Sequence, residues 1–479
     1  MALSTGDSVG HVPDISLPAG GIRRFFASHP IGFWFIFWGE FAERASYYGM
    51  GGILSVYMAE QLDFGQNKAT TFRHLFIFGC YVLPLLGGYL ADNFFGKYKV
   101  IVGFSIPYIL GHVILGFEST LCLTIALVLL AMGSGAIKPN ISTLMGLTYD
   151  QYRPGLEQLR TTAFSMFYIA INIGAGIAQF AIPRIRTNYG YQLAFLFPAL
   201  LMVIAFIIFA SGKKYYAKEV IVRKQKTPEE RALQRQVLRR IGGLFLLVMF
   251  FWAIFDQSTS TWIFFAKDYM KLEVFGFEID PEQVQALNPW LIVILTPWVA
   301  YLWTVLDRRG FKVRATDKML VGFLVTGLCM AVMAYAGFQA GPGEGEKVTV
   351  AWQMVAYLAL TVAEILISVT GLELAFVAAP KSMKSFVTGM WLVTVGLANL
   401  IVNVPVTKLY FLIEPGFYFG LLALSLVAVA FGFIFVAKRF NRLVEMEKAV
   451  EEEQGPEFPP VSSASENIQV PRDQIKRSI

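Results

Sequence analysis

Two acids and a base interrupt an apolar stretch, residues 31–50, that is long enough to cross a membrane. Together with two tyrosines they have the spacing i, i+3, i+4, i+7 and i+8, which forms one stripe on a helix: Glu40, Glu43, Arg44, Tyr47 and Tyr48. A charge at the centre of a membrane helix costs roughly 2.5–3.5 kcal/mol on insertion scales, and such charges mark ion or substrate paths inside helix bundles. We therefore expect this stripe to bind protons or substrate.

Three further charges lie in later apolar runs. Lys138 follows the small residues Gly133-Ser-Gly-Ala, and the acids Asp256 and Glu364 lie in the second half of the chain. We expect salt bridges between the bases of the first half and the acids of the second half. These would hold one gate shut until an acid is protonated or a substrate competes for a base. The alternative is that the charges form ion pairs that only pack the bundle.

The composition identifies the class of protein. Of the 479 residues, 56% are hydrophobic and 15% are charged, whereas soluble domains have about 25% charged residues. A membrane helix needs about 20 apolar residues. Twelve runs are long enough, near residues 30–58, 68–91, 98–117, 119–143, 161–183, 190–211, 240–266, 285–306, 316–338, 351–378, 385–409 and 415–437. We predict an all-α membrane protein with twelve transmembrane helices in two six-helix bundles.

The runs divide the chain into two halves. The predicted order is an N-terminal cytoplasmic segment (1–28), a six-helix bundle (29–211), a basic cytoplasmic linker (212–239), a second six-helix bundle (240–438) and a disordered cytoplasmic tail (439–479). This layout is typical of transporters whose substrate site lies between the halves near the membrane midplane. In the linker, Thr227-Pro-Glu-Glu predicts the start of a helix, which could be a short surface helix.

The loops predict the orientation. Their basic residues lie on one side of the predicted spans, which the positive-inside rule makes cytoplasmic; Arg184 and Arg186 are exceptions. We expect a multi-pass protein of the cell (inner or plasma) membrane with both termini in the cytoplasm. The net charge of +6 then comes from the basic loops on the cytoplasmic side of the lipid bilayer, and we expect no nucleic-acid binding. Residues 1–22 are polar and do not resemble a cleavable signal.

Cysteine and histidine usage indicates no metal or redox site. Cys80, Cys122 and Cys329 all lie in apolar runs, where small buried thiols are expected rather than disulfides. No cluster of cysteine and histidine has metal-ligand spacing. We expect no cofactor, with protons as the coupling ion, and a monomeric protein.

The loop between the second and third runs contains Gly88-Tyr-Leu-Ala-Asp-Asn-Phe-Phe-Gly-Lys-Tyr-Lys99. Its glycines permit a tight turn and close helix packing. The sequence resembles the loop motif G-x-x-x-D-x-x-x-G-[RK]-x-[RK] of the major facilitator superfamily. That resemblance implies the major facilitator fold and a gating role, rather than substrate contact, for Gly88, Asp92, Gly96 and Lys97.

Two longer motifs resemble a single family. Glu40-x-x-Glu-Arg-x-x-Tyr-Tyr-Gly49 closely matches E-x-x-E-R-F-x-Y-Y-G of the proton-dependent oligopeptide transporter (POT) family. Phe167-Tyr-Ile-Ala-Ile-Asn-Ile-Gly174 matches the family's F-Y-x-x-I-N-x-G. Lys138-Pro-Asn140, Asn288-Pro289, Glu364 and Trp391 also stand where the family has them. The similarity runs from about residue 30 to residue 437, which is nearly the whole membrane portion.

The resemblance implies roles for individual residues. Arg44 and Lys138 would receive the carboxylate of a peptide and Glu364 would hold its ammonium group, since a zwitterion needs a base at one end and an acid at the other. The remaining substrate contacts would come from Asn172 and Asn288 for the peptide backbone and from Tyr48, Tyr81 and Trp391 for its side chains. For each aromatic residue, plain packing is the alternative.

The coupling proton would be taken up by Glu40 and Glu43, beside Arg44, and by Asp256. His74 lies six residues before Cys80, a spacing that animal members of the family share, so it is a candidate proton relay. A satisfied structural histidine is the alternative.

Two positions depart from the family pattern. Ala45 replaces a phenylalanine, and Gly51 stands where many peptide-transporting members have an arginine. Gly51 continues the stripe that begins at Glu40. The resemblance therefore implies that Asp256 lacks its usual cationic partner from the other half.

The function predicted from these observations is proton-coupled import of di- and tripeptides across the cytoplasmic membrane by alternating access. One alternative keeps the family and mechanism but changes the substrate, to an amino-acid conjugate or nitrate. Another is a non-transporting substrate receptor, which would be expected to have lost the coupling acids. We do not expect an enzyme, because the sequence has no HExxH, GxSxG or paired catalytic aspartates.

Overall fold

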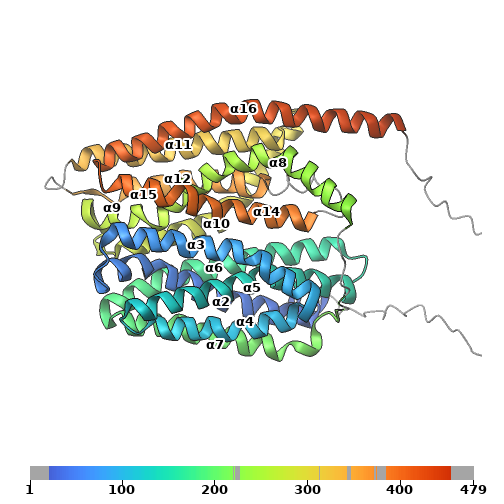
Figure 1. Cartoon of the computed structure of the whole chain (residues 1–479), viewed down its shortest axis with the longest axis horizontal. Coiled ribbons are helices and arrows are strands. Elements are labelled where there is room, and N and C mark those ends of the chain that lie inside the picture. The colour runs from blue at the N-terminus through green and yellow to red at the C-terminus, as the bar shows by residue number, and fades with distance from the viewer. Residues whose placement is uncertain are drawn as a thin grey trace, which may run out of the picture.

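Two bundles of long helices pack side by side in the computed structural model (Figure 1). The structure describes residues 21–219, 221, 227–311, 313–341, 347–371, 374 and 384–454. The first part of the predicted N-terminal segment (1–20), part of the predicted linker (220 and 222–226) and the end of the predicted tail (455–479) lie outside these residues.

The first bundle is formed by residues 21–211. A short helix, α1 (Gly21–Ser28), precedes the six long ones. These are α2 (Ile31–Val56), extended by the π-helical turn η1 (Tyr57–Gln61), α3 (Gly65–Leu90), extended by η2 (Ala91–Phe95), α4 (Lys97–Leu115), α5 (Thr120–Tyr152), α6 (Glu157–Tyr189) and α7 (Tyr191–Ser211). A 3₁₀ turn, η3 (Lys213–Tyr215), follows.

The second bundle has more interrupted helices. It contains α8 (Pro228–Phe255), η4 (Asp256–Thr259), α9 (Thr261–Tyr269), η5 (Pro281–Ala286), α10 (Leu287–Arg308), α11 (Ala315–Ala340), α12 (Ala351–Glu364), η6 (Ile365–Val369), α14 (Lys384–Leu397), η8 (Ala398–Asn403), α15 (Val404–Tyr410) and α16 (Pro415–Gln454). Four two-residue strands lie among the described residues of this bundle. β1 (Met270–Lys271) pairs in parallel with β4 (Val348–Thr349), and β2 (Glu273–Val274) pairs antiparallel with β3 (Phe277–Glu278).

In the described part of the chain, eleven helical stretches are long and apolar enough to cross a membrane. The remaining predicted span is α2, whose 26 residues include the charged residues Glu40, Glu43 and Arg44. At a rise of 1.5 Å per residue, α2 is about 39 Å long, which exceeds the roughly 30 Å of a bilayer core. The predicted all-α membrane fold is therefore confirmed.

Small residues bring α3 and α5 into close contact. A Cβ atom on Gly87 would lie 2.5 Å from the Cα of Ala136, and one on Gly135 would lie 2.6 Å from the Cβ of Leu83. Asn140 reinforces this contact, because its Nδ2 donates to the carbonyl oxygen of Gly87 at 3.2 Å. This packing places the middle of α5, with Lys138, directly beside α3.

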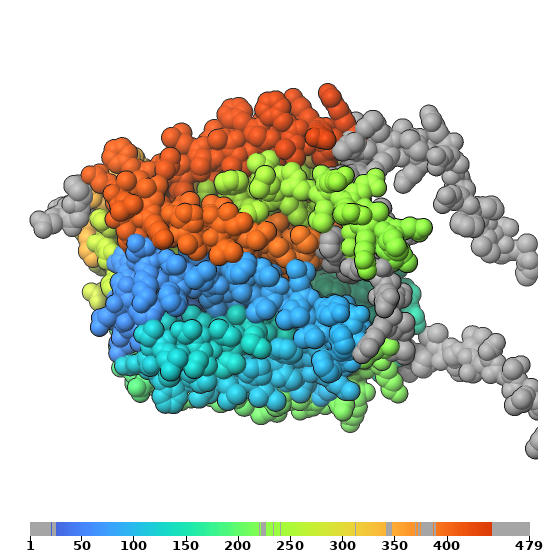
Figure 2. Space-filling model, viewed as in Figure 1, coloured from blue at the N-terminus to red at the C-terminus, as the bar shows by residue number. Residues whose placement is uncertain are grey.

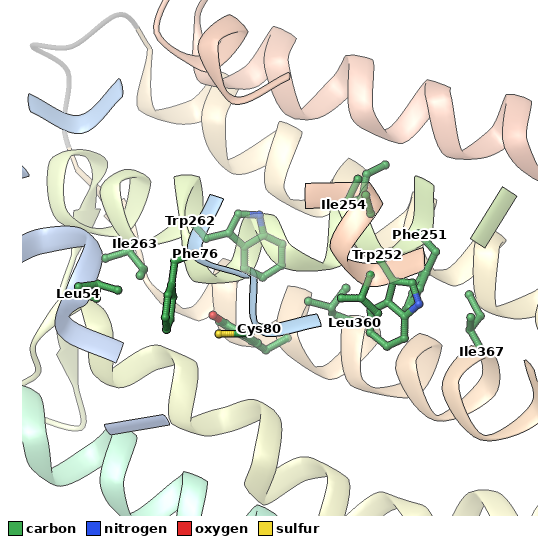
Figure 3. Close-up of a cluster of buried hydrophobic side chains, with 14 of the residues drawn as sticks. Leu54, Phe76, Cys80, Phe251, Trp252, Ile254, Trp262, Ile263, Leu360 and Ile367 are labelled. Carbon is green, nitrogen blue, oxygen red and sulfur yellow. The ribbon is translucent and has the colours of Figure 1, made fainter. Parts of the chain in front are cut away.

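The two bundles meet along α3 and α14, which lie side by side at the seam in Figure 2. A Cβ on Gly396 would lie 3.0 Å from Val82 of α3. Figure 3 shows part of the core that both bundles share: Leu54 of α2 and Phe76 of α3 lie near Ile263 and Trp262 of α9. The core of the first bundle is thus continuous with that of the second, because the helices α2 and α3 bury apolar surface against the second bundle.

Several polar contacts between the bundles lie at one end of the molecule. We call this the far end, because it is opposite the end that carries Lys97 and Arg308. Glu60 forms an ion pair with Lys267 there, and the Nε2 of Gln66 donates to Asp268 at 2.8 Å. These contacts join the two bundles across the far end.

One far-end ion pair explains an exception to the loop charges. The Nη2 atom of Arg186 donates to both carboxylate oxygens of Glu282 at 2.8 Å. It also lies 3.6 Å from Asp280, which accepts a hydrogen bond from Thr187. Arg186 thus binds the second bundle and is not a free loop charge.

The linker and tail are more helical than predicted. Thr227 caps α8 through a reciprocal pair of hydrogen bonds with Glu230, as the sequence predicts, but the helix then continues into the seventh span. It is therefore not a separate surface helix. Similarly, α16 continues to Gln454, so the segment 439–454 is helical rather than disordered. Its Glu, Lys, Ala and Met residues are good helix formers.

Candidate substrate and proton site

The charged stripe of α2 forms a compact buried cluster. The Nε atom of Arg44 lies 3.0 Å from Glu40 and also forms an ion pair with Glu43. All three side chains are almost fully buried. The i, i+4 spacing brings Glu40 beside Arg44 on one helix face, and Glu43 is three residues after Glu40 on the same stripe. The guanidinium also lies 5.6 Å from the ring centre of Tyr47.

Lys138 of α5 is near this cluster but forms no salt bridge with it. It interacts electrostatically with Arg44, Glu40 and Glu43. Its Nζ lies 3.9 Å from the ring centre of Tyr81 on α3, a cation–π contact. Among the described residues no carboxylate lies within ion-pair distance of Lys138. The amine thus remains available for an anionic ligand.

The buried polar atoms of the cluster are not all satisfied. Nη2 of Arg44, Oε2 of Glu40 and Oε1 of Glu43 are buried and have no hydrogen-bond partner in the part of the chain described. Buried groups of this kind are rare in folded proteins unless a ligand, proton or water completes them. The cluster therefore has the donors and acceptors to bind both an anion and a proton.

Glu364, at the end of α12, is the acid on the opposite side of the interface between bundles. Its Oε2 accepts a hydrogen bond from the Nδ2 of Asn288 at 2.8 Å, and the same amide donates to Thr361 at 3.2 Å. Tyr48 of α2 interacts electrostatically with both Arg44 and Glu364. Tyr48 is therefore near both the basic cluster of the first bundle and the acid of the second.

The other predicted substrate residues lie on helices around these groups. Tyr48, Tyr81 and Glu364 are half-buried. Asn172 is buried on α6, where its Nδ2 donates to the carbonyl oxygen of Tyr168 one turn earlier. Trp391 on α14 is also buried; it packs edge-on against Phe245, with ring centres 5.7 Å apart. These contacts position both residues, and their predicted roles toward a substrate stay predictions.

A hydrogen-bonded chain joins His74 to Asp256 across the bundles. Nδ1 of His74 is 2.7 Å from Oδ1 of Asn399, and Nδ2 of Asn399 donates to Asp256 at 2.5 Å. Since the amide oxygen can only accept, Nδ1 carries the proton as the Asn399 amide is oriented here. A π-helical turn, η8, places Asn399 at this position. His74 is fully buried, and its Nε2 has no partner in the described structure.

The predicted salt bridges between the halves are not formed by the predicted residues. Arg44 pairs with acids of its own helix, Glu364 is held by Asn288, and Asp256 is held by Asn399. Arg44 instead pairs with Glu40, one turn away on α2, and with the preceding residue Glu43. Among the described residues, the ion pairs between the bundles join Arg186 to Glu282 and Asp280, and Lys267 to Glu60, all at the far end.

The consequence inferred from Gly51 stays a prediction. Asp256 forms no ion pair among the described residues, although it interacts electrostatically with Arg73 of α3 and with Lys138. The Nη1 atom of Arg73 donates to the carbonyl oxygen of Gly51 at 2.9 Å. Arg73 thus lies beside the position where the family pattern has an arginine.

The predicted gating motif lies at the end of the bundle opposite the far end. Gly96 has φ +79°, a conformation that favours glycine, and it turns the chain from η2 into α4. The Nζ of Lys97 lies 3.0 Å from Asp92 and 2.9 Å from Glu219 of the linker. Glu219 also accepts from the backbone N–H of Lys97 at 2.7 Å, so it caps the N-terminus of α4. A Cβ atom at Gly88 would meet no described atom within 4 Å, so this position shows no steric need for glycine.

Several polar residues of the interface were missed by the sequence analysis. Arg73 is a charge within the predicted second span, adjacent to His74, and this alone could have identified it. Asn399 and Asn403 have the spacing i, i+4 within the eleventh span, which places both amides on one helix face. Glu219 gives no comparable signal, because it is one acid in a charged linker.

The chain is similar to known membrane transporters. A sequence model of the POT family matches residues 98–231 and 218–410. Solute carrier family 15 member 2 of Mus musculus is 33% identical over 364 residues, which cover 65% of this chain and 49% of that protein. The chain therefore spans about half the length of this curated relative.

Solved structures extend the similarity to the fold. The POT family transporter PepTSo has a TM-score of 0.75 at 30% identity, covering 86% of this chain and 99% of that chain. A mutant of the peptide transporter POT in complex with alafosfalin has a TM-score of 0.78 at 25% identity, covering 89% and 97% of the two chains. The two-bundle architecture is therefore shared with these transporters along most of the chain.

Proposed function

Because the chain belongs to the POT family of multi-pass membrane transporters, we propose that it is a proton-coupled symporter that imports di- and tripeptides by alternating access. The observation that carries this proposal is the presence of opposite charges on the two bundles, with Tyr48 near both. Arg44 and Lys138 lie on the first bundle, and Glu364 lies on the second. A short peptide has the complementary pair of charges at its two ends.

Each pole suits one end of a peptide. The free Nη2 of Arg44 and the amine of Lys138 are donors for a carboxylate, and such charge-assisted bonds are among the strongest that side chains make. Glu364 has one oxygen bound to Asn288, which leaves its other oxygen to accept from an ammonium group. Half-buried aromatic side chains, Tyr48 and Tyr81, lie beside these groups and would contact the variable part of a peptide.

The charge balance of the cluster supports coupling to protons. With both acids ionised, Glu40 and Glu43 cancel the charges of Arg44 and Lys138. Protonation of one acid leaves a net charge of +1, which favours the binding of a carboxylate. By linkage, a bound carboxylate favours protonation to the same extent. A proton and a peptide would therefore bind together, which is what symport requires.

The orientation of the protein in the membrane follows from the loop charges. The positive-inside rule makes the end with Lys97 and Arg308 cytoplasmic, so the far end faces outward. We propose that the far end, with its Arg186–Glu282 and Glu60–Lys267 ion pairs, is the outer gate in its shut state. The membrane would be the cell membrane, with both termini in the cytoplasm, and the working unit a monomer.

The alternatives use the site less completely. A transporter of nitrate or another simple anion would need the bases but has no use for Glu364 and its Asn288 partner. An amino-acid conjugate with a free ammonium group would use both poles, and it remains a candidate substrate. A substrate receptor has no need of two acids beside the carboxylate site.

Uptake by the purified protein in liposomes tests the proposal. With an acidic exterior, dialanine should accumulate above its external concentration, and a protonophore should abolish the accumulation. N-acetylated dialanine, which lacks the ammonium group, should be a poor substrate. Nitrate uptake with no dialanine uptake would contradict the proposal.

A further inference from the structure

Arg73 is a buried cation to which the proposed function assigns no role. It lies on α3, one residue before His74, and only 7% of its surface is exposed. Its single hydrogen bond in the described structure goes from Nη1 to the carbonyl oxygen of Gly51, and its Nε is buried with no partner. A buried arginine is costly unless an anion compensates its charge. A backbone carbonyl alone does not supply that compensation.

Gly51 leaves room for this guanidinium. A Cβ atom at position 51 would lie 3.2 Å from Nη1 and 3.4 Å from Nη2 of Arg73. Any larger side chain on α2 would occupy the volume that the guanidinium now fills. Gly51 and Arg73 are thus sterically complementary: α2 has no side chain there, and α3 places a cation at the same point.

The acid that interacts with Arg73 is Asp256 of the second bundle. The two charges interact electrostatically, and the other groups acting on Arg73 are Tyr47 of α2 and Cys80 and Tyr81 of α3. Among the described residues Arg73 and Asp256 are not within ion-pair distance. The carboxylate of Asp256 is instead held by Asn399, which is bound in turn to His74.

Other charges reach Asp256 from further elements. Lys138 of α5 acts on it, and Asp256 itself acts on Glu364 of α12. Removal of a proton from Asp256 therefore changes the field at both poles of the substrate site. The attraction between Asp256 and Arg73 also joins η4 of the second bundle to α3 of the first, between the substrate site and the far end.

We infer that Arg73 is a positioning residue for proton coupling: from α3 it supplies the cation that holds ionised Asp256 across the bundles, in the space left by Gly51. Protonation of Asp256 removes this attraction and allows the bundles to separate at the far end. This inference rests on the proposed symport. It adds a residue, and a reason for Gly51, that the symport proposal does not need.

The alternative is that Arg73 only ties α3 to α2 through the Gly51 carbonyl. The two possibilities differ in whether the effect of Arg73 depends on Asp256. Proton-driven uptake of dialanine, its pH profile and dialanine exchange at equal pH should be measured in proteoliposomes for wild type, Arg73→Gln, Asp256→Asn and the double variant. Lys68→Gln is the matched control, since Lys68 is an exposed cation on the same helix.

Arg73→Gln should reduce proton-driven uptake at least tenfold while exchange persists. Its pH profile should move to higher pH, because loss of a nearby cation favours the neutral carboxyl. In the Asp256→Asn background, Arg73→Gln should cause no further change. Lys68→Gln should behave as wild type. An equal loss from Arg73→Gln with and without Asp256 would overturn the inference, as would an unchanged pH profile.

Moving the charge gives an independent test if Arg73→Gln folds poorly. Gly51→Arg combined with Arg73→Gln places the cation on α2, in the same space. This double variant should have at least fivefold higher uptake than Arg73→Gln alone, and its pH profile should return toward that of wild type. A double variant that is monodisperse and binds dialanine but recovers nothing would contradict the inference. Failure of the wild type itself to couple peptide to protons would instead refute the proposed function.

Discussion

Glu364→Gln tests the ammonium pole of the proposed site. The substitution removes the negative charge and keeps the size of the side chain. Asn288, which now donates to Oε2 at 2.8 Å, can still donate to the amide oxygen of glutamine. The local packing should therefore survive, and the main loss should be the ionic bond to the peptide ammonium group.

The size of the effect follows from that one bond. A hydrogen bond to a charged group contributes about 1.5–3 kcal/mol. At about 1.4 kcal/mol per tenfold change, the KM for dialanine should rise roughly 10- to 150-fold. N-acetylated dialanine has no ammonium group, so its weak transport should change less than about threefold.

Dialanine exchange in liposomes at equal pH is the appropriate assay, since it reports binding and translocation without net proton movement. Glu273→Gln is a matched control, because Glu273 is an exposed glutamate of β2. An equal loss for free and N-acetylated dialanine would refute the reasoning. So would an unchanged KM for dialanine.

Four further variants test other parts of the account. Lys138→Gln should raise the KM for dialanine roughly 10- to 150-fold through loss of a carboxylate contact, measured by exchange. Glu43→Gln should abolish gradient-driven accumulation but preserve exchange, because the cluster then has a net charge of +1 with Glu40 ionised, so that a carboxylate can bind without uptake of a proton. Arg186→Gln should increase labelling of a cysteine placed at Ser55, in a background without native cysteines, because it removes a far-end ion pair with Glu282. Gly87→Leu should destabilise the protein by at least about 1–3 kcal/mol, seen as a lower melting temperature in detergent, because even a Cβ there lies 2.5 Å from Ala136.

Each of these four predictions has a result that would contradict it. Unchanged exchange by Lys138→Gln would mean that Lys138 does not bind the peptide carboxylate. Accumulation by Glu43→Gln would show that another group carries the proton. Unaltered labelling in Arg186→Gln would mean that this ion pair does not hold the far end shut. A melting temperature for Gly87→Leu equal to that of wild type would mean that α3 and α5 are not packed as described.

The fold was predictable because each membrane helix is visible in the sequence as a long run of apolar residues. The spans from α2 to α16 were found from runs of apolar residues, and no tertiary information was needed. Helix ends were less predictable. The start of α8 at Thr227 follows from its capping residues, but its continuation into the seventh span depends on packing that a local motif does not encode.

The local part of the site was also predictable. Glu40 and Arg44 form the ion pair that their i, i+4 spacing predicts, whereas the ion pair between the adjacent residues Glu43 and Arg44 does not follow from that rule. The contacts between bundles were not, since sequence spacing gives no distance between helices that are far apart in the chain. Arg44 and Asp256 were expected to form cross-bundle pairs, yet each is held by a nearer partner.

Gly51 shows the limit of reasoning from one position. The absence of an arginine there was visible in the sequence, but the presence of Arg73, 22 residues later, beside the same position was not. Only the packing of α3 on α2 shows that the two positions share one space. A missing charge in a motif is therefore better sought on the neighbouring helix than assumed to be lost.

Peptide-driven proton movement tests the central claim most directly. Liposomes containing the protein and a trapped pH indicator, with equal pH on both sides and the membrane potential clamped at zero, should acidify inside when dialanine is added outside. The acidification should saturate with dialanine and should be absent in Glu43→Gln. Entry of dialanine without acidification would contradict the account, because the protein would then carry peptide without a proton.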